Sequence, residues 1–244
     1  MISLIHIGKT GGTTIDHLLR DKIELYKVYH HNKNYTKDEK YIIWIRNPIN
    51  RFVSAFNHSY YGINTDVSNI KTLNFNNCLI PARMEKALKT KDYVFSPNYD
   101  RLMRSFKTAN ELAEGLTSSD ISIKKRAEEL MNCIEEHFLK GIGWYLNNGI
   151  FVKNRHKRII FVGRQENMKE DILELGKILN VSLDENKKVR ENIYVDKSMK
   201  YLSQTAIENI KEWYKSTDYC ALNELHNYGF ITKEVLDSYN TYFI

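Results

Sequence analysis

Two short segments hold the residue types best suited to binding an anionic ligand. The first spans residues 8–14 (GKTGGTT) and directly follows the apolar run 2–7. Lys9 supplies a positive charge, and the two glycines let the backbone approach a ligand. Thr13 and Thr14 add hydroxyl donors at the start of a predicted helix, where the backbone N–H groups and the helix dipole favour anions. The segment therefore predicts an anion-binding turn. The alternative is an ordinary strand-to-helix turn with Thr13 as its N-cap.

The same segment differs from the phosphate loop of nucleoside triphosphatases. That motif needs a glycine five residues before the GKT at 8–10, and the residue there is Ser3. A kinase with a degenerate phosphate loop stays open as an alternative, but it would need an aspartate at the end of a buried strand to hold Mg²⁺. The predicted strands end instead at His30, Arg46 and Gly163.

The second segment, residues 46–54 (RNPINRFVS), also begins where a buried strand ends. Arg46, Arg51 and Ser54 lie around a turn and the start of a predicted helix, where they can converge on one phosphate, and arginine offers forked, charge-assisted hydrogen bonds. For the two arginines alone, surface ion pairing is the alternative. Two anion-binding turns at one sheet edge favour a ligand site, because open α/β sheets bind ligands at the carboxyl ends of their strands.

The elements that must position these turns follow from the apolar patterning. Continuous apolar runs predict strands that are buried on both faces, and helical spacing of apolar residues alternates with them. This alternation predicts an α/β fold with a P-loop-like, mostly parallel central sheet flanked by helices, in a single domain covering residues 1–244. Residues 62–141 read as a helical insertion that shapes an acceptor site. The predicted strands are 2–7, 25–29, 41–45 and 158–162, and the predicted helices are 15–24, 49–61, 82–89, 100–113, 122–138, one from 168 that begins with a capping box, and one or two within 203–225.

Composition narrows the function class. The 244 residues carry a formal charge of +6, but acidic residues are interleaved with the basic ones, so a nucleic-acid-binding module is only an alternative and no nucleic-acid partner is expected. Three distant cysteines without a CxxC pair encode neither a disulfide framework nor a zinc site, and no metal is expected. With no signal peptide and no apolar run of membrane-spanning length, a soluble, cytoplasmic protein without a membrane partner is expected.

Together, segments 6–14 and 46–54 resemble sulfotransferases that use 3′-phosphoadenosine 5′-phosphosulfate (PAPS). Segment 6–14 resembles the loop that binds the 5′-phosphosulfate, and segment 46–54 resembles the 3′-phosphate-binding segment, in the form found in the branch that sulfates polysaccharide hydroxyls (heparan/chondroitin type). Weaker likeness continues through residues 161–167 and at 218–219. Gly8 stands where the family usually has proline, which makes the loop less rigid.

The resemblance implies a role for each residue. Lys9 would contact the oxygen that bridges the sulfuryl group and the 5′-phosphate, and Thr10, Gly11, Gly12, Thr13 and Thr14 would hold the 5′-phosphate. Arg46 and Ser54 would hold the 3′-phosphate, with Arg51 as support. In-line transfer of this kind is catalysed mainly by positioning and electrostatics, and a metal ion is not required.

An acceptor hydroxyl also needs a general base. Related polysaccharide sulfotransferases use a histidine between the two nucleotide motifs, where this chain has His30 and His31. Because neighbouring residues on a strand point to opposite faces, one of the two is expected to act, and His31 is preferred over His30. The expected activity is sulfuryl transfer from PAPS to a hydroxyl of a glycan or a small molecule. An inactive, nucleotide-binding relative is the remaining alternative.

Overall fold

The computed structural model describes residues 1–28, 38–64, 97–134, 137–186 and 197–242. Their Cα positions form two compact units, each built from separate stretches of the chain. The first unit contains Met1–Arg51, Lys140–Lys188 and Ile210–Phe243, and the second contains Phe52–Leu139 and Val189–Asn209. None of the helices in the described ranges combines the length and apolar character that a bilayer crossing demands.

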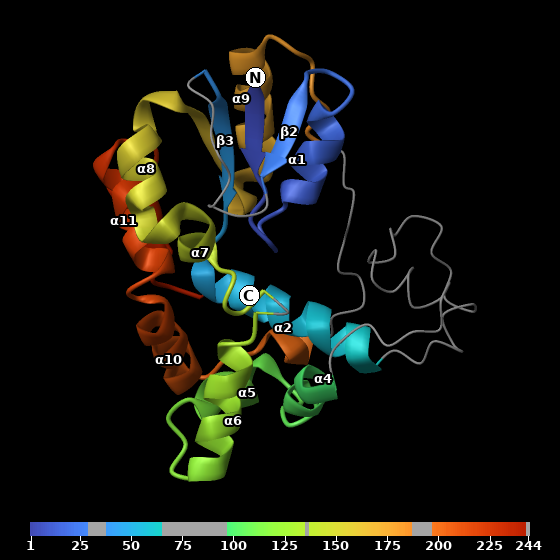
Figure 1. The fold of residues 1–244 in the computed structure, drawn as a ribbon, viewed down its shortest axis with the longest axis vertical. Helices are drawn as coiled ribbons and strands as arrows, with labels where there is room; N and C mark the ends of the chain where they lie inside the picture. Colours follow the sequence, from blue (N-terminus) through green and yellow to red (C-terminus); the bar gives the residue numbers. More distant parts are fainter. Residues whose placement is uncertain (29–37, 65–96, 135–136, 187–196, 243–244) are drawn as a thin grey trace, which may run out of the picture. The chain divides into compact units, whose positions relative to one another are not determined.

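A four-stranded sheet organises the first unit (Figure 1). Its strands are β1 (Ile2–Ile5), β2 (Leu25–Val28), β3 (Lys40–Ile45) and β4 (Ile159–Arg164), in the spatial order β2-β1-β3-β4. Every pair is parallel. The chain leaves β1 towards β2 on one side, whereas β3 lies on the other side of β1. The carboxyl ends of β1 and β3 therefore meet at a topological switch point, where α/β sheets bind their ligands.

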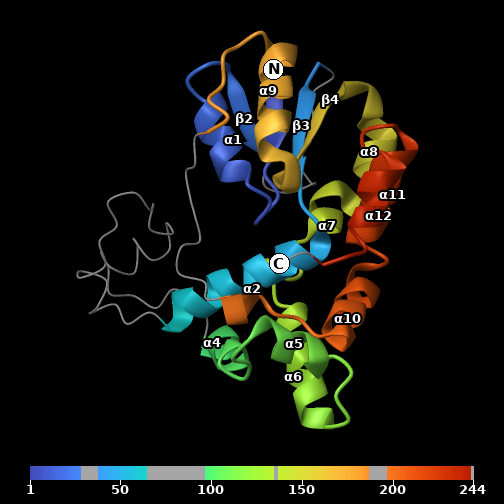
Figure 2. The ribbon, with the colours of Figure 1, turned by 180° about the vertical axis from the view of Figure 1, so that it is seen from behind.

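One face of this sheet is covered by helices α1 (Gly12–Leu19) and α9 (Met168–Leu179), and α9 lies behind the strands in Figure 1 and in front of them in Figure 2. The core on this face includes Trp44, whose ring centroid lies 5.9 Å from that of Phe161. A Cβ at Gly163 would lie 2.3 Å from the Trp44 ring, so only glycine leaves room for the indole. The buried residues of this face are Leu4, Ile15, Leu18, Leu19, Ile42, Trp44, Phe161, Ile172, Leu175 and Leu183.

The opposite face carries the remaining helices of the unit. Tyr41 of β3 packs edge-on against Phe151 of α8 (Ile150–Arg155), with 5.0 Å between the ring centroids. The other elements here are α7 (Ile142–Leu146), the short 3₁₀ helices η2 (Asn147–Gly149) and η3 (His156–Arg158), α11 (Asp218–Asn227) and α12 (Lys233–Ser238). A further 3₁₀ helix, η4 (Gln165–Asn167), connects β4 to α9.

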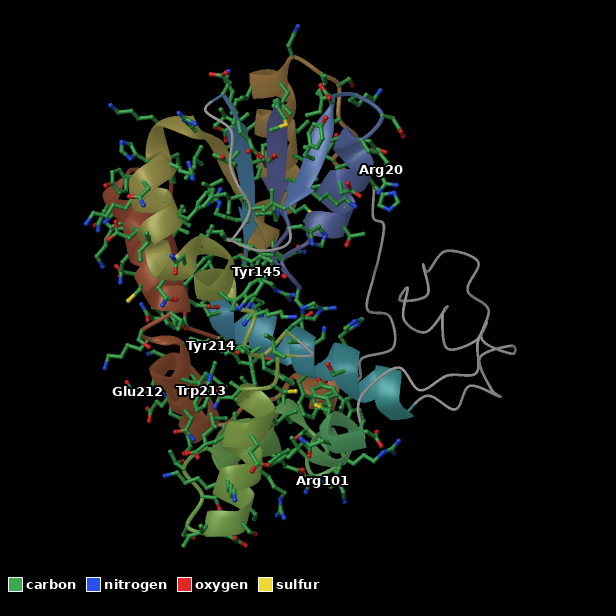
Figure 3. The ribbon with its side chains drawn as sticks, in the orientation of Figure 1. Arg20, Arg101, Tyr145, Glu212, Trp213 and Tyr214 are labelled. Carbon is green, nitrogen blue, oxygen red and sulfur yellow. The ribbon has the colours of Figure 1, made fainter. Side chains whose placement is uncertain are left out.

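A buried carboxylate ties α1 to β2. Asp16 is 3% exposed and pairs with Arg20 at the end of α1 (labelled in Figure 3) and with Lys27 of β2. Burial disfavours the Asp16 carboxylate, but hydrogen bonds and charge from Lys27 and Arg20 outweigh this and hold the pKa of Asp16 below its ordinary value. The two cations thus keep this carboxylate ionised inside the fold.

The described part of the second unit is helical. Two helices have residues in both units: α2 (Pro48–Asn64), whose first residues belong to the first unit, and α10 (Gln204–Tyr214), whose last residues belong to it. Ser203 fixes the start of α10 to α5, because its hydroxyl donates to Glu114 (2.6 Å) and its N–H to Asn110 (2.7 Å). The other elements are α4 (Pro97–Met103), α5 (Ala109–Gly115), α6 (Ile121–Met131) and the 3₁₀ helix η5 (Lys197–Lys200).

These observations confirm the predicted α/β fold with a parallel sheet and correct some boundaries. The predicted helix 100–113 is two helices, because Thr108 caps α5 through the N–H of Glu111. The capping box predicted at residue 167 does not form, since Asn167 makes no capping hydrogen bond and donates to Asp171 instead. The predicted helix 82–89 lies outside the described residues. No strand occurs in the described part of 62–141, and its role as an insertion stays a prediction.

Candidate functional site

The loop between β1 and α1 turns sharply before the helix starts. Gly11 is the N-cap of α1 with φ +92°, and Lys9 also has a left-handed φ of +68°. The Thr10 hydroxyl donates to the Ile7 carbonyl at 3.0 Å, which fixes the loop from inside, and the Thr14 N–H donates to the Gly11 carbonyl at 2.9 Å. A non-glycine residue with positive φ is strained, and such residues cluster at functional sites.

The start of α1 can receive an anion. Since the first N–H groups of a helix have no acceptor within it, and those of Thr14 and Ile15 already donate to the Gly11 carbonyl, the N–H groups of Gly12 and Thr13 are available to a ligand. A Cβ at Gly11 would lie 2.0 Å from Oε1 of Gln165, so the Gln165 side chain packs directly against the backbone of the loop. The six residues Lys9 to Thr14 thus form the predicted turn. The N-cap of α1 is Gly11, and not Thr13 as in the alternative of an ordinary strand-to-helix turn.

The ring of His6 lies beside this helix start. An ideal Cβ at Gly12 would lie 3.1 Å from Cδ2 of His6, so the imidazole packs against the backbone of the turn. This packing gives His6 a structural role.

Residues Arg46 and Asn47 form the turn between β3 and α2, called the β3–α2 turn below. Oδ1 of Asn47 accepts from the N–H groups of Ile49 (2.9 Å) and Asn50 (3.3 Å), which caps α2. The guanidinium of Arg46 donates through Nη1 to the Lys9 carbonyl at 3.3 Å. The structure therefore brings the two predicted turns together at the carboxyl edge of β1 and β3.

Arg46 keeps donor capacity at this edge. Its Nε is buried and has no hydrogen-bond partner among the described residues. Burial lowers the pKa of the Arg46 guanidinium, while the negative charge of Glu166 raises it and Arg51 lowers it further. Arginine nevertheless stays protonated in proteins. A buried, permanently charged donor of this kind is suited to a phosphate oxygen.

Arg51 faces the interior. Its side chain is 0% exposed, and its Nε lies 3.5 Å from Oδ2 of Asp218, which is 1% exposed. The guanidinium also lies 5.3 Å from the centre of the Tyr214 ring at the end of α10 (Figure 3), and Oδ1 of Asp218 accepts from the Gly143 N–H at 2.8 Å. Burial raises the pKa of the Tyr214 hydroxyl, so it stays protonated beside this pair. Arg51 therefore holds the start of α2 against α7 and α11.

Three further candidates stay predictions. Ser54 is half-buried on α2 and belongs to the second unit, so its convergence with Arg46 stays a prediction. His30 and His31 lie outside the described residues. No group of three His, Cys, Asp or Glu side chains that could hold a metal ion occurs in the ranges that the structure describes.

The sequence did not predict the residues that fix the β3–α2 turn through long-range hydrogen bonds. The Asn47 N–H donates to Oε1 of Glu166 at 2.9 Å, and the other carboxylate oxygen accepts from the Tyr239 hydroxyl at 3.0 Å. Glu166 lies in the segment 161–167 that drew attention by likeness, but no local pattern pairs it with residues 119 positions earlier and 73 positions later.

Comparison with known proteins identifies the family to which the chain is similar. A family model described as "Sulfotransferase family" matches residues 2–233, nearly the whole length. No curated protein and no solved structure matches the chain.

Proposed function

The chain belongs to the sulfotransferase family, and from this premise we propose that it transfers a sulfuryl group from PAPS to a hydroxyl group of a carbohydrate. The observation that carries the proposal is the hydrogen bond from Arg46 to the Lys9 carbonyl, 3.3 Å long, which joins the two turns that are predicted to bind anions. A nucleotide with two separate phosphate positions needs two such turns side by side.

The β1–α1 turn would hold the 5′ end of the donor. The N–H groups of Gly12 and Thr13 face the ligand position at the helix start, and the hydroxyls of Thr13 and Thr14 add donors. Lys9 would neutralise the charge that develops on the bridging oxygen as its bond to sulfur breaks. The left-handed φ of +92° at Gly11 supports this use, because it lets the backbone turn sharply into the start of α1.

The β3–α2 turn would hold the 3′-phosphate. Arg46 offers a half-buried cation whose buried Nε donor has no partner among the described residues, and Ser54 would add a hydroxyl. Arg51 would act as support, because its own charge is already balanced by Asp218 inside the fold.

In the transfer step, the acceptor oxygen forms a bond to sulfur while the bond from sulfur to the bridging oxygen breaks. The acceptor proton would go to His31, or to His30, because imidazole is the side-chain base that is best suited to proton transfer near neutral pH. The nucleotide leaves as 3′-phosphoadenosine 5′-phosphate (PAP).

Thermal unfolding tests the donor assignment. PAP at about one hundred times its Kd stabilises a protein by about 2.7 kcal/mol, which raises the Tm by about 5–10 °C for a chain of this size. We expect this shift with PAP, none with ATP and Mg²⁺, and its loss in Arg46→Ala. The control is Arg101→Ala, which removes an exposed arginine of α4. A shift with ATP and Mg²⁺ alone would favour a kinase instead.

Labelled sulfate transfer tests the rest of the proposal. With PAPS as donor and a panel of glycans, small alcohols and phenols as acceptors, we expect transfer to a glycan and its loss in Lys9→Ala. His30→Ala and His31→Ala should differ sharply in rate, with the larger loss in His31→Ala. Full activity in both histidine variants would refute the proposed base, and transfer to phenols alone would refute the carbohydrate acceptor.

A further inference from the structure

A segment near the end of the chain contacts the β3–α2 turn. This C-terminal segment, residues 238–242, begins at the last residue of α12. Nδ2 of Asn47 donates to the Thr241 carbonyl at 2.7 Å and lies 3.5 Å from the Ser238 carbonyl. Asn47 thus uses its side-chain oxygen to cap α2 and its side-chain nitrogen to hold the C-terminal segment.

A carboxylate connects the turn and the segment a second time. Glu166 accepts from the Asn47 N–H through one oxygen (2.9 Å) and from the Tyr239 hydroxyl through the other (3.0 Å). The Tyr239 side chain is 2% exposed, and its carbonyl accepts from the Tyr219 hydroxyl at 2.9 Å. Burial raises the pKa of the Tyr239 hydroxyl, and the charge of Glu166 raises it further, so it remains a donor.

The C-terminal segment lies beyond the part of the chain that the family model matches, which ends at residue 233. Its contacts nevertheless converge on the residue next to Arg46. The charged and titratable groups that act on the Arg46 guanidinium include Glu166, Tyr242 and Tyr239, so two of them come from this segment. A part of the chain outside the family match is therefore built into the surroundings of the arginine that the proposed function assigns to the 3′-phosphate.

We propose that Asn47, Glu166 and Tyr239 are positioning residues for the donor: together with the C-terminal segment they hold the β3–α2 turn so that Arg46 presents its guanidinium to the 3′-phosphate. This inference rests on the proposed function. None of the three needs to touch the nucleotide. Their effect is on the backbone from which the Arg46 side chain leaves, because Asn47 is bonded through its N–H and both atoms of its amide group.

Two conservative variants loosen the turn without removing its helix cap. Asn47→Ser keeps an N-cap oxygen but is too short to reach the Thr241 carbonyl, and Tyr239→Phe removes only the hydroxyl that meets Glu166. Asn240→Ser is the matched control, because Asn240 lies in the same segment, is exposed, and its side-chain amide donates to the Leu236 carbonyl of α12, away from the β3–α2 turn.

The readout is calorimetric binding of two nucleotides, PAP and adenosine 5′-phosphate, which lacks the 3′-phosphate. Loss of one hydrogen bond weakens binding by about three- to tenfold where that bond sets the geometry of the binding group. We expect each variant to raise the Kd for PAP by this factor, to change the Kd for adenosine 5′-phosphate less than twofold, and to leave kcat at saturating donor unchanged. Asn240→Ser should match the wild type for both ligands.

Glu166 supplies the rescue test. Glu166→Ala removes both acceptors and should weaken PAP binding by about tenfold or more. Glu166→Gln keeps an acceptor for the Asn47 N–H and an amide that can bond to the Tyr239 oxygen, so it should restore most of the affinity.

The outcomes distinguish a failure of the proposed function from a failure of this inference alone. If the wild type binds both nucleotides equally, there is no 3′-phosphate site, and the proposed function and this inference fail together. If the wild type prefers PAP but the variants keep that preference, only the inference is overturned. The same holds if the variants weaken both nucleotides equally or if circular dichroism shows that they lose folded structure, because the contacts then serve stability alone.

Discussion

The ion pair of Arg51 and Asp218 allows a sharp test, because both side chains are inaccessible to solvent. Asp218→Ala removes the carboxylate 3.5 Å from the Arg51 Nε and also the acceptor of the Gly143 N–H. Removing one partner of a buried pair typically costs about 3–5 kcal/mol, because the remaining charge stays buried without compensation. Since native proteins are stable by about 5–15 kcal/mol in total, this one change would remove a large fraction of the free energy of unfolding.

Urea unfolding, followed by tryptophan fluorescence, to which the fully buried Trp44 of the sheet contributes, measures the effect. With a slope of about 3 kcal/mol per molar urea, the expected loss lowers the midpoint by about 1–1.7 M. Asp237→Ala is the control, because it breaks an exposed pair with Lys233 in which both side chains are more than half exposed, and it should change stability by less than about 1 kcal/mol.

A double variant separates the charge from the packing. Arg51→Met with Asp218→Asn removes both charges and keeps an acceptor for the Gly143 N–H, so it should be more stable than Asp218→Ala. If Asp218→Ala and Asp237→Ala shift the midpoint equally, the pair does not support the fold as described. If the double variant is less stable than Asp218→Ala, the loss does not come from an uncompensated charge.

Three further outcomes follow from the same structure. Gly11→Ala should lower the free energy of unfolding by about 1–3 kcal/mol and weaken PAP binding, because φ is +92° and the added Cβ would lie 2.0 Å from Oε1 of Gln165. Urea unfolding measures the stability and calorimetry measures the binding. Unchanged stability and affinity would show that the conformation of the turn is not tightly fixed. Asp16→Asn should lose stability at pH 7 but little at pH 3. A carboxylate with a lowered pKa stabilises the fold above its unfolded pKa of about 3.9, and this stabilisation is lost as the pH falls through the folded pKa. Equal losses of stability at both pH values would contradict this explanation. Arg46→Lys should weaken PAP binding in calorimetry, because lysine keeps the charge but lacks the forked donors; unchanged affinity would mean that charge alone suffices.

Much of the sheet could be predicted because parallel strands are buried on both faces and therefore appear as continuous apolar runs. The run 41–45 is fully buried in β3, and the two turns follow β1 and β3 as expected. Helix ends were harder to predict. The segment 100–113 contains no proline, and its break depends on Thr108, whose pattern with Glu111 is a helix-start signal that apolar spacing alone does not register.

The contacts behind the site could not be predicted from local pattern. The sequence indicates that Arg51 is a ligand-binding cation. Its partner Asp218 is 167 residues away, so only the fold shows that the charge of Arg51 is balanced inside the protein. Asn47 likewise reads as a turn residue, and its bonds to Glu166 and Thr241 depend on tertiary structure. Residue type predicts what a side chain can bind, whereas long-range packing decides whether it is already bound.

The sheet unit is assembled from three stretches of chain, and the last of them starts at residue 210. During synthesis from the amino terminus, the four strands are made before Asp218 and Thr241, so Arg51 and Asn47 lack these partners until residues 210–243 have been added. Domains fold as units during translation, at about 5–20 residues per second. The site at the carboxyl edge of β1 and β3 can therefore complete its supporting contacts only after all four strands have been synthesised.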